Sequence, residues 1–203
     1  MFAEIVGLAV LRDTHSAEEQ TDILNHCFAA LEAAVVEFGG CIDKFIGAGL
    51  MALFGVPTAI ENAPRQALNA AVAMGTRMRR SQLDLALPVE LRLHMGINSG
   101  LVIAGEIGGR VRRGFTVMGD TTNAASRLKD AAPVGAIFVG PETYRLTRDH
   151  FDFGEIQPLR LKGKAEPLAA RALMSTSPHA TRPAARSASN ALPRRWGIKT
   201  ATG

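Results

Sequence analysis

Cysteines and aromatic residues are scarce in this sequence, and both shortages restrict its class. Two cysteines, Cys27 and Cys41, cannot build the disulfide framework of a small secreted domain, so we expect core thiols and a cytoplasmic location. With one tyrosine and one tryptophan, the chain lacks the aromatics of an RNA-binding sheet face, and no nucleic-acid partner is expected. No run of about eighteen apolar residues occurs, which predicts no membrane segment.

Common enzyme motifs are also missing. The sequence has no P-loop pattern and no G-x-S-x-G elbow, and its five histidines lack the spacing of metal ligands. His94, on the polar side of an expected strand, is predicted to be a surface residue. Gly47, Gly49 and Ala52 match the relaxed dinucleotide fingerprint, but a strand rather than a helix is expected after them, so we reject the match.

The net charge of +4 is concentrated at the C-terminal end of the 203-residue chain. Residues 175–203 hold five basic residues and no acidic one, so residues 1–174 carry a net charge of −1. This end is rich in Ala, Ser, Thr, Pro and Arg and has no apolar period, which predicts a disordered, solvated basic tail. The length of residues 1–174 suits one compact domain.

Apolar periodicity predicts an α+β fold. The first expected strands lie at residues 2–8, 41–46, 50–54 and 89–97, and the first expected helices run from Ser16 to Phe38 and from Pro64 to the residue before Pro88. This order is that of a ferredoxin-like βαββαβ antiparallel sheet with helices on one face. The first strand should be central, yet it begins one residue after Met1, so we expect it to be truncated.

Shorter elements are expected in the second half of the chain. They are strands at 101–105, 115–118 and 137–139, helices at 120–129 and 141–147, and an antiparallel hairpin that runs through Leu161 and on to Leu173 and turns at residues 162–164.

Four segments, in order along the chain, share the pattern of one enzyme family. They are Phe2–Gly7, Gly39–Gly55, Phe115–Leu128 and Leu161–Pro167, with further agreement at His94–Gly100 and Ala104–Gly105. Together they resemble the class III adenylyl/guanylyl cyclase catalytic domain of the bacterial adenylate cyclase type, from Phe2 to about Leu173. The resemblance implies the nucleotide cyclase fold, in which a small C-terminal αβ subdomain follows the βαββαβ sheet.

The resemblance also implies a reaction. An adenylate cyclase domain of this family converts ATP to cyclic AMP and pyrophosphate at a dimer interface, for intracellular signal transduction. Two Mg²⁺ or Mn²⁺ ions, held by two aspartates, serve the reaction. One chain of the dimer supplies the metal carboxylates. The other supplies the residues that read the base and stabilise the transition state.

The base-reading positions match the family. Lys44 aligns with the lysine that reads the purine edge, and Thr116 aligns with its partner, which is aspartate or threonine in adenylyl cyclases. A cation facing a ring nitrogen suits adenine, and guanine-specific relatives usually carry glutamate at the position of Lys44. The resemblance therefore implies ATP rather than GTP as the substrate.

The catalytic positions match as well. Asn123 aligns with the residue that orients the ribose, and Arg127 with the arginine that stabilises charge at phosphorus. The two lie four residues apart on an expected helix, so they share one face. Lys162 and Lys164 lie at the turn where the family has a phosphate-binding lysine, and which of them contributes is left open.

The metal positions depart from the family. Glu4 stands in place of the first aspartate, and its extra methylene shifts the carboxylate, whereas Mg²⁺ demands near-ideal octahedral geometry. Ala48 stands in place of the second aspartate and offers no ligand. The backbone of Ile5 is the remaining expected metal contact. Leu8 and Ala9 replace the usual Phe-Thr, which removes a hydroxyl near the phosphates.

Three functions remain open on this evidence. The chain could be an active adenylate cyclase homodimer with weakened metal binding, against which Glu4 and Ala48 argue. It could be the half of a heterodimer whose partner is an aspartate-bearing cyclase domain. It could also be a nucleotide-binding pseudocyclase. Diguanylate cyclases share the sheet topology but need an acidic pair where Cys41 and Ile42 stand, so they are set aside.

Overall fold

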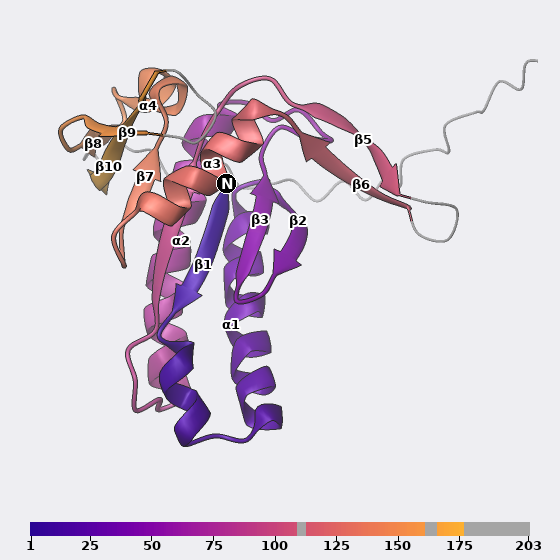
Figure 1. The fold of residues 1–203 in the computed structure, drawn as a ribbon, viewed down its shortest axis with the longest axis vertical. Helices are drawn as coiled ribbons and strands as arrows, with labels where there is room; N and C mark the ends of the chain where they lie inside the picture. The colour runs from indigo at the N-terminus through magenta and orange to yellow at the C-terminus, as the bar shows by residue number, and fades with distance from the viewer. Residues whose placement is uncertain (109–112, 161–165, 177–203) are drawn as a thin grey trace, which may run out of the picture.

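The computed structural model describes residues 1–108, 113–160 and 166–176, and Figure 1 shows their arrangement. The first half contains β1 (Phe2–Val6), the 3-10 helix η1 (Leu8–Asp13), α1 (Ala17–Glu37), β2 (Cys41–Ile46), β3 (Gly49–Leu53), α2 (Ala63–Asp84) and β4 (Arg92–Ile97). The second half contains β5 (Ile103–Gly108), β6 (Arg113–Met118), α3 (Asp120–Ala131), β7 (Ile137–Val139), α4 (Pro141–Thr147), β8 (Phe151–Phe153), β9 (Gln157–Leu159) and β10 (Leu168–Thr176). The expected tail lies outside the described residues from position 177 onward.

The predicted βαββαβ unit is present. Its strands follow the order β2-β3-β1-β4, and each neighbouring pair is antiparallel. β1 is central, with Glu4 opposite Gly49 on β3 and opposite His94 on β4. This register brings the first expected metal position between the β2–β3 turn and the polar side of β4.

The sheet continues beyond this unit with the small C-terminal part. β7 pairs with β4 in parallel. β10 then pairs with β7, and β8 pairs with β10, both antiparallel. The expected late hairpin is formed by β9 and β10, whereas its turn lies outside the described residues. β5 and β6 form a separate two-stranded ribbon that projects from the body of the domain (Figure 1).

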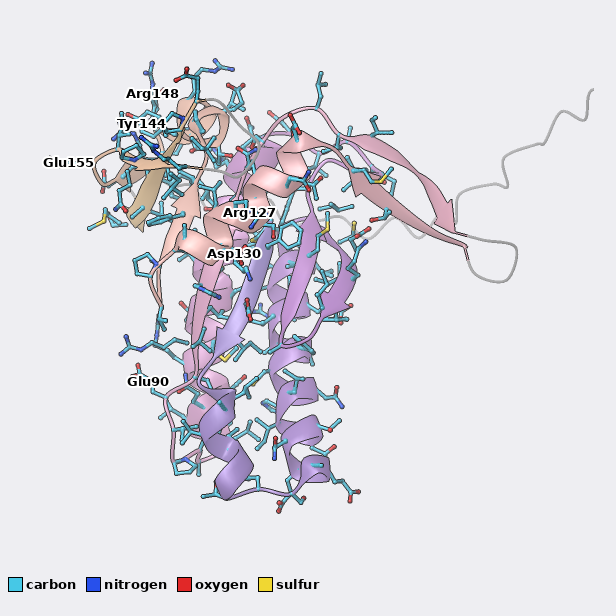
Figure 2. The ribbon with its side chains drawn as sticks, viewed as in Figure 1. Glu90, Arg127, Asp130, Tyr144, Arg148 and Glu155 are labelled. Carbon is cyan, nitrogen blue, oxygen red and sulfur yellow. The ribbon has the colours of Figure 1, made fainter. Side chains whose placement is uncertain are left out.

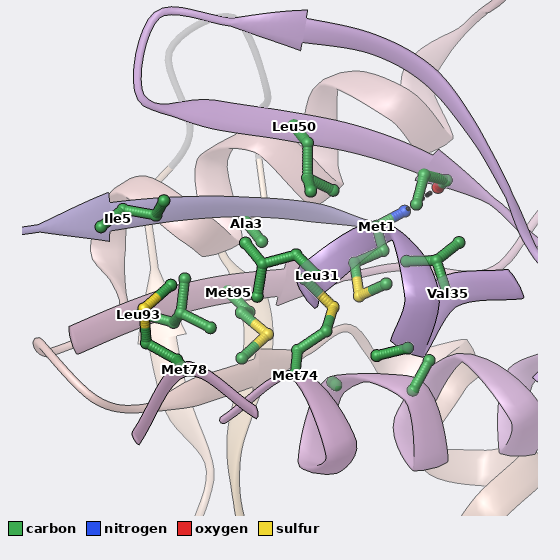
Figure 3. Packing of buried hydrophobic residues seen from close by; sticks show 14 of the residues in the cluster. Met1, Ala3, Ile5, Leu31, Val35, Leu50, Met74, Met78, Leu93 and Met95 are labelled. Atoms are coloured by element: carbon green, nitrogen blue, oxygen red, sulfur yellow. Dashed lines mark hydrogen bonds between the residues drawn. The ribbon is translucent and has the colours of Figure 1, made fainter. Parts of the chain in front are cut away.

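The main core lies between the sheet and the helices α1 and α2. Ser16 begins α1 with the predicted capping box, in which Glu19 is the reciprocal partner. Apolar residues at helical spacing on α1 and α2 then pack against alternate residues of the strands, because each element has one buried face. Figure 3 shows this packing for Leu31, Val35, Met74, Met78, Ala3, Ile5, Leu93 and Met95.

The opposite face of the sheet carries α3. Gly96 on β4 makes this possible, since a Cβ atom there would lie 2.1 Å from the carbonyl oxygen of Ala125 and 2.2 Å from the backbone nitrogen of Lys129. The helix backbone therefore rests directly on the strand. The helices α1 and α2 share one face, as predicted, and α3 is added to the other.

Several boundaries differ from the prediction for local reasons. β1 ends at Val6 instead of residue 8, because Gly7 has a φ of 106° and a Cβ atom there would lie 2.7 Å from the carbonyl oxygen of Glu90. β4 begins at Arg92 instead of Val89, and β8 had not been predicted. No helix in the described ranges is long and apolar enough to cross a bilayer.

Candidate functional site

Lys44 and Thr116 are brought into direct contact. Lys44 lies on the edge strand β2, Thr116 lies on the separate ribbon strand β6, and the ammonium donates to the Thr116 hydroxyl over 2.8 Å. The Lys44 side chain stays 44% exposed, so it is also open to solvent. The two residues predicted to read the base thus form a pair within one chain.

Asp43 holds this pair and was missed by the sequence analysis. Its carboxylate accepts a 2.8 Å hydrogen bond from Thr116 and lies 3.1 Å from the Lys44 ammonium, while its side chain is only 1% exposed. Neighbouring residues of a regular strand point to opposite faces. The register of β2 against β3 shifts between Ile42 and Lys44, and this irregularity lets Asp43 and Lys44 reach the same hydroxyl.

The hydrogen bonds around Thr116 have a fixed direction. An ammonium can only donate and an ionised carboxylate can only accept. Thr116 therefore accepts a hydrogen bond from Lys44 and donates its single hydroxyl hydrogen in a hydrogen bond to Asp43. Towards a ligand, the hydroxyl has only a lone pair to offer.

Asn123 and Arg127 lie one turn apart on α3, and both are exposed. Figure 2 shows Arg127 on this helix. Within the described part of the chain, neither side chain has a hydrogen bond or ion pair. Their polar groups are therefore available to a ligand or to a second chain.

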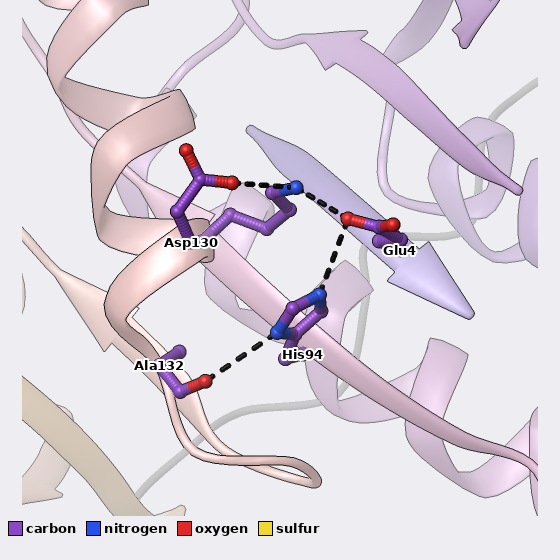
Figure 4. A network of polar contacts seen from close by, with 5 residues as sticks. Glu4, His94, Asp130 and Ala132 are labelled. Carbon is purple, nitrogen blue, oxygen red and sulfur yellow. Dashed lines mark hydrogen bonds and ion pairs between the residues drawn. The ribbon is translucent and has the colours of Figure 1, made fainter. Parts of the chain in front are cut away.

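Glu4 is tied into a network with α3 and β4 (Figure 4). Its Oε2 atom accepts a hydrogen bond from the Lys129 ammonium and lies 3.3 Å from His94 Nε2. Lys129 also pairs with Asp130 at 2.8 Å, and His94 Nδ1 lies 3.4 Å from the carbonyl oxygen of Ala132. The prediction that His94 is a surface residue was wrong, because its side chain is only 16% exposed.

The network changes the acidity of two groups. The hydrogen bond from Lys129 holds the pKa of the Glu4 carboxyl below its ordinary value, against the opposite effect of burial. Burial by itself would lower the pKa of Lys129. The hydrogen bonds to Asp130 and Glu4 outweigh it, and the pKa of the ammonium is raised. Both groups are therefore held in their charged forms.

A backbone hydrogen bond joins Ala48, the second expected metal position, to the residue that follows Glu4. The amide of Ile5 donates to the carbonyl oxygen of Ala48 over 3.0 Å, and the Ala48 side chain ends in a methyl group. Magnesium takes about six oxygen ligands, whereas this edge offers one carboxylate with a lysine bound to it. Among residues 1–108, 113–160 and 166–176, no group of three or more His, Cys, Asp or Glu side chains could hold a metal ion. The residues present do not fit a magnesium ion held by this chain alone.

The expected site residues form three separate groups. They are the Lys44–Thr116 pair, the exposed residues of α3, and the edge with Glu4 and Ala48. No hydrogen bond or ion pair between described side chains joins one group to another. The last two candidates, Lys162 and Lys164, lie outside the described residues.

Comparisons with known sequences point to one family. Residues 1–173 match the sequence model described as "Adenylate and Guanylate cyclase catalytic domain". Adenylate cyclase 1 of Rhizobium meliloti is 31% identical over 132 residues, which cover 64% of this chain and 20% of that protein. The chain spans between 19% and 30% of the length of the curated relatives that it matches first.

Solved structures share the fold over most of the chain. The adenylyl cyclase CyaB from P. aeruginosa is similar with a TM-score of 0.80 and 28% identity, covering 89% of this chain and 94% of that one. The guanylyl cyclase Cya2 is similar with the same TM-score and 25% identity, covering 90% of this chain and 94% of that one. Equal similarity to both kinds of enzyme establishes the α+β cyclase fold and leaves the base unassigned.

Proposed function

This chain belongs to the adenylate and guanylate cyclase catalytic domain family, and on that basis we propose that it takes part in converting ATP to cyclic AMP and pyrophosphate. In this proposal it is one half of a dimer. It supplies the residues that read the base and stabilise the transition state, and an aspartate-bearing cyclase domain supplies the metal carboxylates. The observation that carries the proposal is the Lys44–Thr116 pair held by Asp43.

The direction of hydrogen bonding at Thr116 supports adenine. By the family resemblance, Lys44 faces the acceptor nitrogen of the purine ring. Thr116 can then accept a hydrogen bond from the neighbouring amino group, because its own hydroxyl hydrogen is donated to Asp43. Guanine in the same orientation would turn a ring N–H towards the ammonium and a carbonyl oxygen towards an acceptor. This mismatch favours ATP over GTP.

The residues of α3 suit the reacting end of the nucleotide. During cyclisation the ribose 3′-oxygen bonds to the α-phosphorus and pyrophosphate leaves, so negative charge grows on the phosphoryl oxygens. Arg127 keeps its guanidinium donors available for that charge. Asn123, one turn earlier, can orient the ribose. Lys162 or Lys164 would add a further contact to the phosphates.

The metal in this proposal belongs to the partner. The partner's two aspartates would hold Mg²⁺ or Mn²⁺, which would neutralise charge on the triphosphate. The Glu4 and Ala48 edge of this chain does not fit an ion. Two copies of this chain would lack the second carboxylate at both sites. A homodimer is therefore proposed to be much slower than the mixed dimer, and cyclic AMP signalling in the cytoplasm is proposed to need the mixed pair.

The test mixes this chain with an aspartate-bearing cyclase domain whose own Asn and Arg are replaced by alanine. Neither protein alone should turn over ATP, and the mixture should release cyclic AMP. The Arg127→Ala variant of this chain should remove that activity, while Arg80→Ala, an exposed arginine on α2, should keep it. A mixture as inactive as its separate components would contradict the proposal.

A second function is favoured by one observation. The Glu4 carboxylate is occupied by Lys129, which suits a domain that binds nucleotide without turning it over. A nucleotide-binding pseudocyclase would bind ATP and give no product with any aspartate-bearing partner. Binding measurements alongside the mixing assay therefore separate the two functions.

A further inference from the structure

Lys129 lies at the metal edge and is not among the residues that carry the family resemblance. The matching segment ends at Leu128, and Lys129 is the next residue of α3. Its ammonium nevertheless contacts Glu4, the residue at the first expected metal position. The contact crosses 125 positions of sequence and is part-buried.

The backbone explains how this contact arises. Gly96 has no side chain, so α3 lies against β4 with the carbonyl oxygen of Ala125 and the amide nitrogen of Lys129 closest to it. Glu4 is opposite His94, two residues before Gly96, on the same polar side of the sheet. The Lys129 side chain therefore has only a short distance to cover between the helix and β1.

The Glu4 carboxylate already has a cation bound to it. Lys129 lies between two carboxylates, those of Glu4 and Asp130, and its side chain is 16% exposed. Both ring nitrogens of His94 face acceptors, the Glu4 carboxylate and the carbonyl oxygen of Ala132. A divalent ion would have to displace the ammonium and would be repelled by it.

We propose that the Lys129 ammonium replaces the divalent cation at this edge, as the permanent counter-ion of Glu4. The chain would then hold no metal of its own, and Glu4 would serve the packing of α3 on the sheet. This accounts for a glutamate at position 4, because the longer side chain extends the carboxylate towards α3. The functional meaning of the inference rests on the proposed half-site role. The measurement of Mn²⁺ binding described below does not depend on that role.

One consequence separates this proposal from a simple loss of the second aspartate. If Ala48 were the only defect, Ala48→Asp would rebuild a pair of carboxylates and restore metal binding. With Lys129 in place, the restored aspartate still shares the edge with a bound ammonium. Metal binding should then need two changes, Ala48→Asp and the removal of the charge at position 129.

The experiment titrates the full chain with Mn²⁺ alone and follows the electron paramagnetic resonance signal of the free ion. Wild type and Ala48→Asp should bind no stoichiometric ion. Ala48→Asp/Lys129→Gln should bind one stoichiometric ion, at least about tenfold more tightly than any weak binding that Ala48→Asp shows. The matched control, Ala48→Asp/Lys129→Arg, keeps the charge and should resemble Ala48→Asp.

Two results would overturn the proposal. One is a stoichiometric Mn²⁺ site in the wild type that is lost in Glu4→Gln. The other is equal affinity in Ala48→Asp and Ala48→Asp/Lys129→Gln. Circular dichroism checks the folding of each variant. If the variant with Lys129→Gln does not fold, the titrations of wild type and Ala48→Asp still test the proposal, because it requires both proteins to lack a stoichiometric Mn²⁺ site. Failure here leaves the mixing assay untouched, so the inference and the proposed function fail separately.

Discussion

The carboxylate of Asp43 accepts a 2.8 Å hydrogen bond from the hydroxyl of Thr116, 73 positions later in the chain. A buried carboxylate needs such a partner, since burial of an unpaired charge is costly. The contact fixes which way Thr116 can bond to a ligand. In the proposed function, Asp43 is thus a positioning residue for the Lys44–Thr116 pair, although it faces away from solvent.

Asp43→Asn should relax the preference for ATP. The amide can donate to Thr116, which frees the hydroxyl proton to donate to the carbonyl oxygen of guanine. We expect the ratio of ATP to GTP affinity to fall by roughly tenfold, the value of about one hydrogen bond. Competition of each nucleotide against a fluorescent ATP analogue measures the ratio. Asp152→Asn, at the β8–β10 edge, is the matched control, and an unchanged ratio in a folded Asp43→Asn chain would count against the role.

Arg127→Ala should affect the reaction far more than binding. Loss of one preorganised donor to the developing charge costs on the order of 10²–10³ in kcat. The rate of cyclic AMP release from the mixed dimer should fall by that amount, with ATP affinity within about threefold of wild type. The exposed side chain makes no hydrogen bond or ion pair within the described residues, so the melting temperature should not change. A loss of affinity equal to the loss of rate would assign Arg127 to binding alone.

Gly96→Ala should destabilise the domain. The added methyl would meet the backbone of α3 at 2.1 Å and 2.2 Å, so the helix must move off the strand. A cost of about 1–3 kcal/mol in the free energy of unfolding is expected from such overpacking. Gly75→Ala in α2 is the control, because its Cβ atom would meet only the tip of Arg79 at 3.9 Å. It should raise stability by about 0.5–1 kcal/mol, and urea unfolding compares the two.

The acid stability of the chain should depend on Glu4. Its pKa is lowered in the folded state, so its contribution to stability is full above the ordinary glutamate pKa and is lost as pH falls through the lowered value. Glu4→Gln removes this contribution. The difference in unfolding free energy between wild type and Glu4→Gln should therefore shrink as pH drops from neutral into that acid range. A difference that stays constant with pH would contradict the ionic role of Lys129.

The sequence predicts the scaffold because its signals are local. The capping box at Ser16, the stop at Gly39 and the alternation through Leu93 and Met95 each depend on a few neighbouring residues. The end of β1 could not be predicted in the same way, because it follows from the approach of Gly7 to the carbonyl oxygen of Glu90.

The site was predictable only in its parts. Lys44 and Thr116 could be named from the family pattern, whereas Asp43 joins them through an irregularity in the register of β2. The contact from Lys129 to Glu4 depends on how closely α3 approaches Gly96, which no periodicity encodes. Both missed residues are charged groups that a sequence alone assigns to solvent.

The half-site role is tested most directly by varying the mole fraction of this chain against the aspartate-bearing partner with its Asn and Arg replaced, at constant total protein. Cyclic AMP release should be near zero with either protein alone and should reach its maximum at an equimolar mixture. Activity that is highest with this chain alone, or absent at every ratio, would contradict the account.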